Sequence, residues 1–192
     1  MKKVVGLSGN VERPSKTRAL VKHAVEAVEA RYGAQGAVYD LFDLSPSLGA
    51  AVRATDLAPE AASILEEIVS ADALVIASPT YKGSYAGLFK HLIDLIDPAA
   101  LRGKPILLAA TGGGDRHALI IEHQLRPLFG FFEALTAPTG VYASEKDFSS
   151  GVLVSPQVIE RLNRAVDQLS PWMELPSPEP AISGWVEQAT GS

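Results

Sequence analysis

The sequence has no cysteine, and this single absence excludes several kinds of chemistry. Disulfide bonds, thiol nucleophiles and cysteine metal sites all need a sulfur atom that the 192 residues do not supply. The four histidines lie at positions 23, 91, 117 and 123, without the spacing of metal ligands. We therefore predict no metal site.

Long apolar runs and an excess of positive charge are also missing. No segment approaches the roughly 20 apolar residues that a membrane-spanning helix needs. The apolar run after Met1-Lys2-Lys3 is too short for a signal peptide. The net charge is −5, which argues against nucleic acid or an anionic membrane as a partner. We expect a soluble, cytoplasmic protein.

Two common nucleotide-binding patterns are absent from the first loop of the chain. A P-loop has a glycine directly before its lysine, whereas Ser15 precedes Lys16 here. The spacing of Gly6 and Gly9 does not match the dinucleotide fingerprint G-x-G-x-x-G. A phosphate monoester held by side-chain hydroxyls is the remaining candidate ligand.

What this loop does contain is suited to an anion. An apolar run rich in valine ends at Ser8, and a helical pattern begins near Ser15. The start of a helix presents unpaired N–H groups and the positive end of its dipole. The hydroxyls of Ser15 and Thr17 would add hydrogen bonds, and Lys16 or Arg18 would add charge. The alternative, a capped helix after an ordinary loop, stays open on these residues alone.

Apolar segments of strand length alternate with helical patterns along the chain. The predicted strands cover residues 3–8, 37–42, 73–77, 105–111 and 139–143, and the predicted helices cover residues 16–32, 60–71, 88–96, 116–135 and 156–170. This alternation indicates an α/β fold with helices on both faces of a parallel sheet. We predict a flavodoxin-like, doubly wound five-stranded sheet in the order 2-1-3-4-5. It forms one domain, residues 1–173, followed by a proline-rich tail, residues 174–192.

Three polar, glycine-rich loops should meet at one edge of this sheet. They follow strands one, three and four, and ligands of such sheets bind outside the carboxyl ends of the strands. The second loop carries Tyr81 and Tyr85 among glycines, so a planar ring could lie close to the backbone. The third offers Thr111 and three glycine amides to the edge of that ring. A phosphate, a linking chain and a planar heterocycle are the parts of FMN, so we predict FMN as the ligand. The alternative is that the three loops only connect strands to helices and bind nothing.

The second and third loops resemble those of a known family. Residues 78–85 read Ser-Pro-Thr-Tyr-Lys-Gly-Ser-Tyr and are followed by Gly87 and Lys90. This segment is similar to the central motif of the NAD(P)H-dependent FMN reductases, as is the segment 111–113 followed by His117. More narrowly, the chain looks like the reductase components of two-component alkanesulfonate or methanesulfonate monooxygenase systems. The resemblance extends from the first predicted strand to about residue 173.

The first loop is similar to the family's phosphate loop at residues 14–17 but has Asn10 where a serine is usual. The resemblance implies hydride transfer from NADH or NADPH to FMN, with the reduced flavin supplied to an FMNH2-dependent monooxygenase. Hydride transfer needs positioning rather than an acid or base, so we predict no catalytic side chain. The residues expected to bind FMN are Ser8, Asn10, Ser15, Lys16, Thr17, Pro79, Thr80, Tyr81, Lys82, Gly83, Ser84, Tyr85, Thr111, Gly112, Gly113, Gly114 and His117.

Other functions on the same fold remain as alternatives. One is a quinone or azo-dye reductase that retains FMN as a prosthetic group. Another is a non-catalytic electron carrier of the flavodoxin type, although such carriers are usually more acidic than this chain. A receiver-type phosphorylation switch would need an acidic pair after the first strand, where Ser8 and Gly9 stand instead.

The predicted helix at residues 116–135 has two further features. It is apolar on two sides, which indicates burial on two sides, and the family resemblance suggests dimers or tetramers built through this region. Its main apolar stripe consists of Ala118, Ile121, Leu125, Leu128, Phe132 and Leu135. Pro127 lies inside the helix and has no N–H, so we predict a π-bulge at residues 122–124. In the resembled reductases an inserted residue matches His123 and favours flavin release; a simple proline kink is the alternative.

Overall fold

A computed structural model describes residues 1–174 of the chain. Apart from Glu174, the tail predicted at residues 174–192 lies outside the described residues. The main sheet is parallel, in the order β2 (Gln35–Asp40), β1 (Lys3–Ser8), β3 (Ala73–Tyr81) and β5 (Pro105–Gly112), and then the short β6 (Leu135–Thr136) and β7 (Val141–Ser144), which both pair with β5. This is the predicted order 2-1-3-4-5 with its last strand in two pieces. The flavodoxin-like architecture is confirmed.

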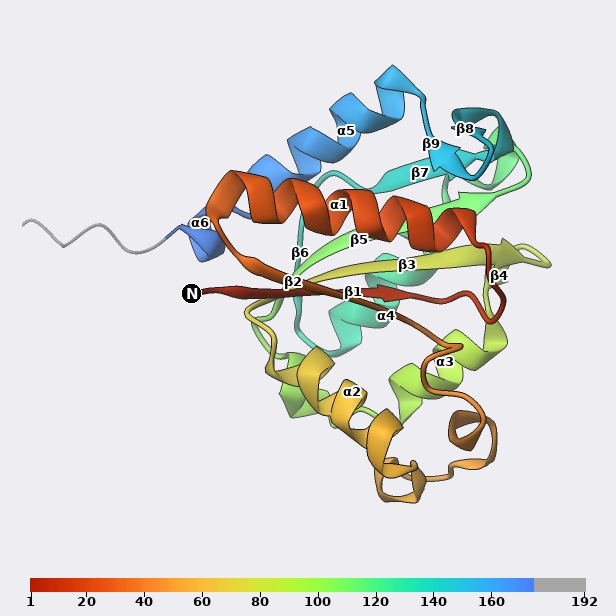
Figure 1. The fold of residues 1–192 in the computed structure, drawn as a ribbon, viewed down its shortest axis with the longest axis vertical. Coiled ribbons are helices and arrows are strands. Elements are labelled where there is room, and N and C mark those ends of the chain that lie inside the picture. Colours follow the sequence, from red (N-terminus) through yellow and green to blue (C-terminus); the bar gives the residue numbers. More distant parts are fainter. Residues whose placement is uncertain (175–192) are drawn as a thin grey trace, which may run out of the picture.

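Helices cover both faces of the sheet (Figure 1). One face carries α1 (Lys16–Tyr32), α5 (Pro156–Asp167) and the short α6 (Ser170–Met173), and the other carries α2 (Pro59–Ser70), α3 (Gly87–Asp94) and α4 (Arg126–Phe131). A small hairpin of β8 (Phe148–Ser149) and β9 (Val152–Leu153) follows β7. Within residues 1–174, no helix combines the length and the apolar character needed to cross a bilayer.

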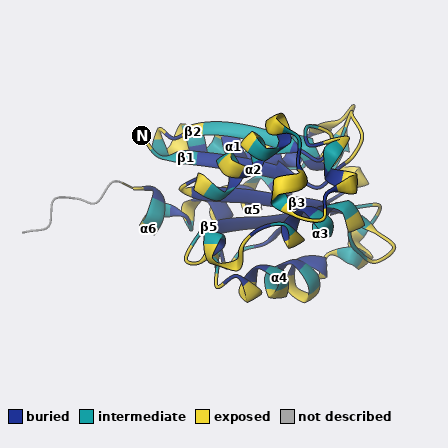
Figure 2. Ribbon diagram, turned by 90° about the horizontal axis from the view of Figure 1, so that it is seen from below, coloured by how far each residue is buried: buried dark blue, intermediate teal, exposed yellow. Residues whose placement is uncertain are grey.

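The central strands are continuously apolar because both of their faces are buried (Figure 2). Successive side chains of a strand point to opposite faces. In β3, Leu74 and Ile76 accordingly join the core under α2 and α3, whereas Val75 joins the core under α1 and α5. The sheet is therefore buried on both faces, and the ends of its strands fix the starting points of the loops that follow them.

The predicted boundaries of the first helix are confirmed. Ser15 is its N-cap, with an extended backbone and a side-chain oxygen that accepts a hydrogen bond from the Arg18 N–H at 3.2 Å. Gly33 ends the helix in the left-handed conformation at φ 63°, which glycine adopts without steric strain.

The prediction of one continuous helix at residues 116–135 is wrong. The chain forms a 3₁₀ turn at Asp115–His117, a π-helix at Ile121–Leu125 and then α4, while residue 135 already belongs to β6. The predicted π-helix is confirmed, because the Arg126 N–H bonds to the carbonyl of Ile121, five residues back. Pro127, next in the chain, has no N–H to give to the preceding turn.

Three other boundaries differ from the sequence prediction. Strand β3 continues through the Ser-Pro-Thr-Tyr segment to Tyr81, where it forms an antiparallel hairpin with β4 (Ser84–Tyr85). Strand β2 ends at Asp40 rather than at residue 42, because a buried carboxylate begins a turn there. The helix predicted at residues 156–170 ends at Asp167, and Pro171 lies in the first turn of the separate α6, where a missing N–H is tolerated.

Close packing of α1 on β1 predicts a strict size limit at Gly6. A Cβ there would lie 2.5 Å from Val21 Cγ1 and 2.8 Å from Val25 Cγ2, so the helix would have to shift. We expect Gly6→Ala to lower the free energy of unfolding by about 1–3 kcal/mol. Urea unfolding measures the change. Gly87→Ala is the control, since a Cβ there meets nothing within 4 Å; equal stability of the two variants would contradict the prediction.

Candidate ligand-binding site

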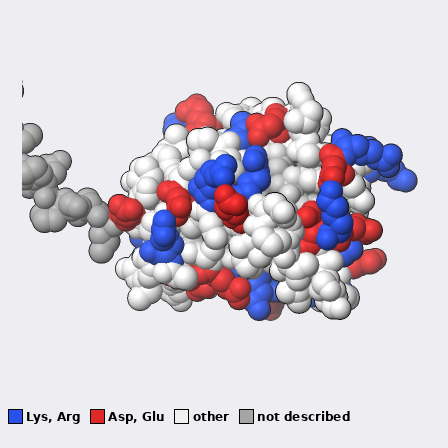
Figure 3. Space-filling model, turned by 90° about the horizontal axis from the view of Figure 1, so that it is seen from above, with Lys and Arg blue, Asp and Glu red and all other residues white. Residues whose placement is uncertain are grey.

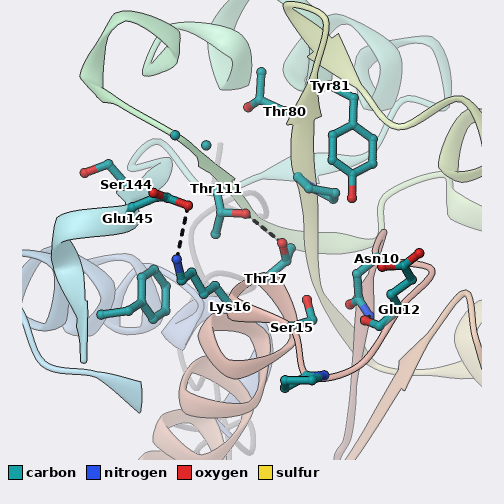
Figure 4. Close-up of a pocket in the computed structure, with 15 residues that line it drawn as sticks. Asn10, Glu12, Ser15, Lys16, Thr17, Thr80, Tyr81, Thr111, Ser144 and Glu145 are labelled. Atoms are coloured by element: carbon teal, nitrogen blue, oxygen red, sulfur yellow. Dashed lines mark hydrogen bonds and ion pairs between the residues drawn. The ribbon is translucent and has the colours of Figure 1, made fainter. Parts of the chain in front are cut away.

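A cavity of about 340 Å³ opens at the carboxyl ends of β1, β3, β5 and β7 (Figure 4). It lies where the strand order reverses between β1 and β3, the usual ligand position in such sheets. Its lining residues are Asn10, Glu12, Pro14, Ser15, Lys16, Thr17, Pro79, Thr80, Tyr81, Thr111, Gly112, Gly113, Ser144, Glu145 and Phe148. The three loops predicted to converge therefore do converge.

The first loop is held by Asp40, which is fully buried at the end of β2. Its carboxylate accepts hydrogen bonds from Arg13 Nε and Nη2, both at 2.8 Å, and from Asn10 Nδ2 at 3.1 Å. Arg18 Nε lies 3.1 Å from the same carboxylate as an ion pair. Asp40 is therefore the anchor of the loop between β1 and α1.

Opposing effects act on the pKa of Asp40. Burial alone would raise this pKa, because it disfavours the charged carboxylate. Hydrogen bonds from Arg13 and Asn10, with the positive charges of Arg13 and Arg18, outweigh burial and lower the pKa below its usual value. Asp40 is therefore ionised at neutral pH, and it engages both arginines of the loop.

Two polar contacts join the start of α1 to other strand ends. Thr17 Oγ1 lies 2.6 Å from Thr111 Oγ1, which links the first loop to the end of β5. Lys16 Nζ lies 3.2 Å from Glu145 Oε1 in the segment after β7. The first N–H groups of α1 have no partner within the helix, and the residues at this helix start, Ser15, Lys16 and Thr17, line the cavity (Figure 4).

At the β3 and β5 end of the cavity, a buried hydroxyl and a bare backbone lie close together. Thr80 Oγ1 is buried and has no hydrogen-bond partner in the part of the chain that the structure describes. A Cβ at Gly112 would clash with Tyr142 Oη and lie 3.3 Å from Thr80 Oγ1. An unpaired buried hydroxyl calls for a ligand or water. Glycine is required at position 112 because the Tyr142 hydroxyl occupies the place of a Cβ, whereas the Cβ position of the next residue, Gly113, is empty.

The structure brings together most of the predicted binding residues. Those that line the cavity are Asn10, Ser15, Lys16, Thr17, Pro79, Thr80, Tyr81, Thr111, Gly112 and Gly113. Those that do not are Ser8, Lys82, Gly83, Ser84, Tyr85, Gly114 and His117. Arg18, predicted as a possible phosphate contact, is also outside the lining because its guanidinium turns to Asp40.

The residues outside the lining have other partners. Ser8 is buried and donates to Asn10 Oδ1 at 2.6 Å, so it orients a lining residue. Ser84 donates to Gln124 Oε1 at 3.1 Å, and Tyr85 packs on Phe89 with ring centroids 6.1 Å apart. Lys82 and Gly83 form the turn of the hairpin, at φ 52° and 86°, and Gly114 and His117 follow the lining glycines.

Sequence reasoning missed a fourth contributing segment. It consists of Ser144 at the end of β7 and of Glu145 and Phe148, which follow it. Glu12 of the first loop also lines the cavity and was not predicted. The signal was present, because a polar Ser-Glu-Lys-Asp run follows the fifth predicted strand and the rule for strand ends applies to it equally. Ser144 is oriented by Asp147, whose Oδ2 accepts from its N–H at 2.7 Å and its hydroxyl at 2.9 Å.

The surface over α1 and α5 mixes acidic and basic side chains without an extended patch of one sign (Figure 3). Within residues 1–174, no group of three or more acidic or histidine side chains is arranged to hold a metal ion.

Comparisons of the sequence and the structure with known proteins identify a family of FMN reductases. A family model for NADPH-dependent FMN reductases matches residues 2–149. An FMN reductase (NADPH) of Pseudomonas aeruginosa is 47% identical over 169 residues, 88% of this chain and 91% of the relative. The NADH-dependent FMN reductase SfnF of Pseudomonas fluorescens is 45% identical, over 88% and 90% of the two chains. The solved apo structure of an NADH:FMN oxidoreductase, EMOB, is similar with a TM-score of 0.75 and 29% identity, over 96% and 100%.

The anchor at Asp40 generates a prediction about stability and pH. We expect Asp40→Asn to lower the free energy of unfolding by about 1.5–3 kcal/mol at pH 7, because the charge-assisted hydrogen bonds from Arg13 and the ion pair with Arg18 are lost. The folded-state pKa of Asp40 is lowered, so this stabilisation is complete above the unfolded value near pH 4 and disappears as the pH falls through the folded value. Urea unfolding at pH 7 and pH 3 measures both effects, and the variant should lose less stability on acidification than the wild type.

Asp43→Asn is the matched control. Asp43 also pairs with Arg13, at 2.7 Å, but its side chain is 26% exposed, whereas Asp40 is fully buried. We expect a smaller loss of stability for this variant. Equal effects at the two positions would show that burial of Asp40 is not what makes the pair important.

Proposed function

Because the chain belongs to the NADPH-dependent FMN reductase family, we propose that it is an oxidoreductase that reduces FMN with NADH or NADPH and binds the flavin in the cavity at the strand ends. The observation that carries this proposal is the pairing of two features in one cavity. The start of α1, which suits an anion, lines the same cavity as the unpaired Thr80 hydroxyl and Gly113, whose Cβ position is empty. These features match the phosphate and the ring edge of one flavin mononucleotide.

The residues present fit FMN at both ends of the cavity. The N–H groups that begin α1, with the hydroxyls of Ser15 and Thr17, suit a phosphate monoester. Thr80 Oγ1, which has no hydrogen-bond partner in the described structure, is free to form a hydrogen bond with the flavin. Gly113, whose Cβ position is empty, leaves room for a flat ring against the backbone, with Tyr81 at the margin (Figure 4).

The chain contributes position rather than acid–base chemistry to the proposed reaction. FMN, when bound, supplies the ring that accepts a hydride from the nicotinamide. The first loop, fixed by Asp40, sets the depth of the phosphate, and the β3 and β5 ends set the plane of the ring. Tyr81 is half exposed at the rim, which leaves one side of the cavity open for a second flat molecule.

We further propose that the reduced flavin serves an FMNH2-dependent monooxygenase of the sulfonate type, on the motif resemblance described above. The choice between NADH and NADPH stays open, because one of the two relatives is described with NADPH and the other with NADH. A homo-oligomer built through the region of α4 also stays a prediction. Its support is an apolar cavity of about 500 Å³ between α3 and α4, beside Phe131, which is 70% exposed.

The role of the π-helix likewise remains a proposal. Gln124 lies within it and accepts a hydrogen bond from Ser84, so the π-helix contacts the hairpin that continues from Thr80 and Tyr81. One residue fewer would rotate Gln124 by about 100° around the helix axis. We propose that His123 is the extra residue and that it keeps the flavin exchangeable.

The function test combines steady-state kinetics with a pair of glycine variants. Wild-type protein should oxidise NADH or NADPH in the presence of free FMN. A Cβ at Gly113 meets no protein atom within 4 Å, so Gly113→Val should fold normally but fill the space of the ring. We expect FMN affinity to fall about tenfold or more, because the valine side chain crowds the ring. A tenfold fall corresponds to a loss of about 1.4 kcal/mol of binding free energy.

Gly114→Val is the control for this test. It also has open space at its Cβ, but Gly114 is outside the cavity lining, so FMN binding and turnover should persist. If both valine variants bind FMN like the wild type, the ring does not lie against residue 113. Wild-type protein that binds FMN without oxidising a nicotinamide would favour the electron-carrier alternative.

A deletion tests the π-helix. Removing His123 should restore the regular hydrogen-bond spacing before Pro127, break the Ser84–Gln124 contact, tighten FMN retention and slow turnover with free FMN. His123→Ala keeps the residue count and should behave as the wild type. FMN dissociation rates from stopped-flow mixing measure the effect. A folded deletion variant with unchanged FMN release would refute the proposed role.

A further inference from the structure

The anion end of the cavity contains an ion pair that crosses it. Lys16, the first residue of α1, places Nζ 3.2 Å from Glu145 Oε1, which comes from the segment after β7 (Figure 4). Both residues line the cavity, and both side chains remain in contact with solvent, 42% and 68% exposed. The pair therefore lies where a bound phosphate would meet Lys16.

Within residues 1–174, Lys16 is the only cationic side chain that lines the cavity. Among the lining residues of the described chain, the charged ones are Glu12, Lys16 and Glu145, two acids against one base. Arg13 is close in sequence, but its guanidinium is bound by Asp40 and Asp43. The only lining cation available to an anion is thus already paired with a carboxylate.

We propose that Glu145 competes with the phosphate of FMN for Lys16 and so weakens flavin binding, making Glu145 a residue that sets FMN exchange. The inference rests on the proposed function. A phosphate monoester carries about −1.5 to −2 charges at pH 7. Its approach either separates Lys16 from Glu145 or brings two like charges together, and both reduce the net gain from binding.

The expected size follows from the exposure of the pair. Exposed ion pairs contribute about 0.2–1 kcal/mol, which corresponds to a change in affinity of up to about fivefold. Such a change matters little for a prosthetic group held by many contacts. It matters directly for a flavin that must enter, be reduced and leave in each turnover.

The experiment measures flavin affinity rather than activity. FMN and riboflavin, which lacks the phosphate, are titrated by fluorescence quenching against wild type, Glu145→Gln, Lys16→Gln and the double variant. Glu145→Gln should tighten FMN about two- to fivefold at low salt, leave riboflavin unchanged, and have little effect on FMN when Lys16 is already Gln. High salt should shrink the difference. Glu160→Gln, which removes the same charge from an exposed pair with Arg164 on α5, should leave both affinities unchanged.

Each other outcome overturns the inference. Unchanged or weaker FMN binding in Glu145→Gln would show that the carboxylate does not compete. Equal tightening of FMN and riboflavin would place the effect away from the phosphate, and a full effect without Lys16 would remove the pair from the explanation. Wild-type protein that binds neither flavin would overturn the proposed function and this inference with it, whereas FMN binding unaffected by Glu145→Gln overturns the inference alone.

Discussion

The arrangement of the site depends on one buried carboxylate. Burying an ionised carboxylate is unfavourable unless charged partners and hydrogen bonds surround it. Asp40 meets this condition through Asn10, Arg13 and Arg18, all from the segment between β1 and the first turn of α1. The end of β2 therefore fixes the path of a loop that otherwise has few apolar contacts. The N-terminus of α1, with its unpaired N–H groups, takes its position from this anchor.

Much of the fold could be predicted because its signals are local. Buried parallel strands are recognisable as short apolar runs, as at residues 73–77 and 105–111. The boundaries of α1 follow from Ser15 and Gly33, whose side chains or backbone suit helix ends. Pro127 predicted the π-helix because a missing N–H requires a local rearrangement. The convergence of the loops followed from topology, since parallel strands end at one edge.

The parts that could not be predicted depend on contacts between distant residues. Asp40 resembles any acid at a strand end until Arg13, 27 positions earlier, is known to lie against it. The Ser-Pro-Thr-Tyr segment looks like a loop because proline cannot donate in a sheet, yet Pro79 continues β3 alongside β5. This extension also creates the hairpin that holds Lys82 to Tyr85, which are outside the cavity lining. The helix after β5 was overestimated because its apolar periodicity continues across turns of different types.

The same anchor determines the electrostatic character of the anion end. Without Asp40, Arg13 and Arg18 would give the first loop two free positive charges and a strong, unselective attraction for anions. With Asp40 in place, the guanidinium groups act as structural donors, and anion recognition passes to neutral N–H groups, hydroxyls and the single ammonium of Lys16. Neutral donors recognise an anion by direction and distance more than by charge. In the proposed function, such a site would hold the flavin phosphate through geometry, which suits a ligand that is bound in register and then released.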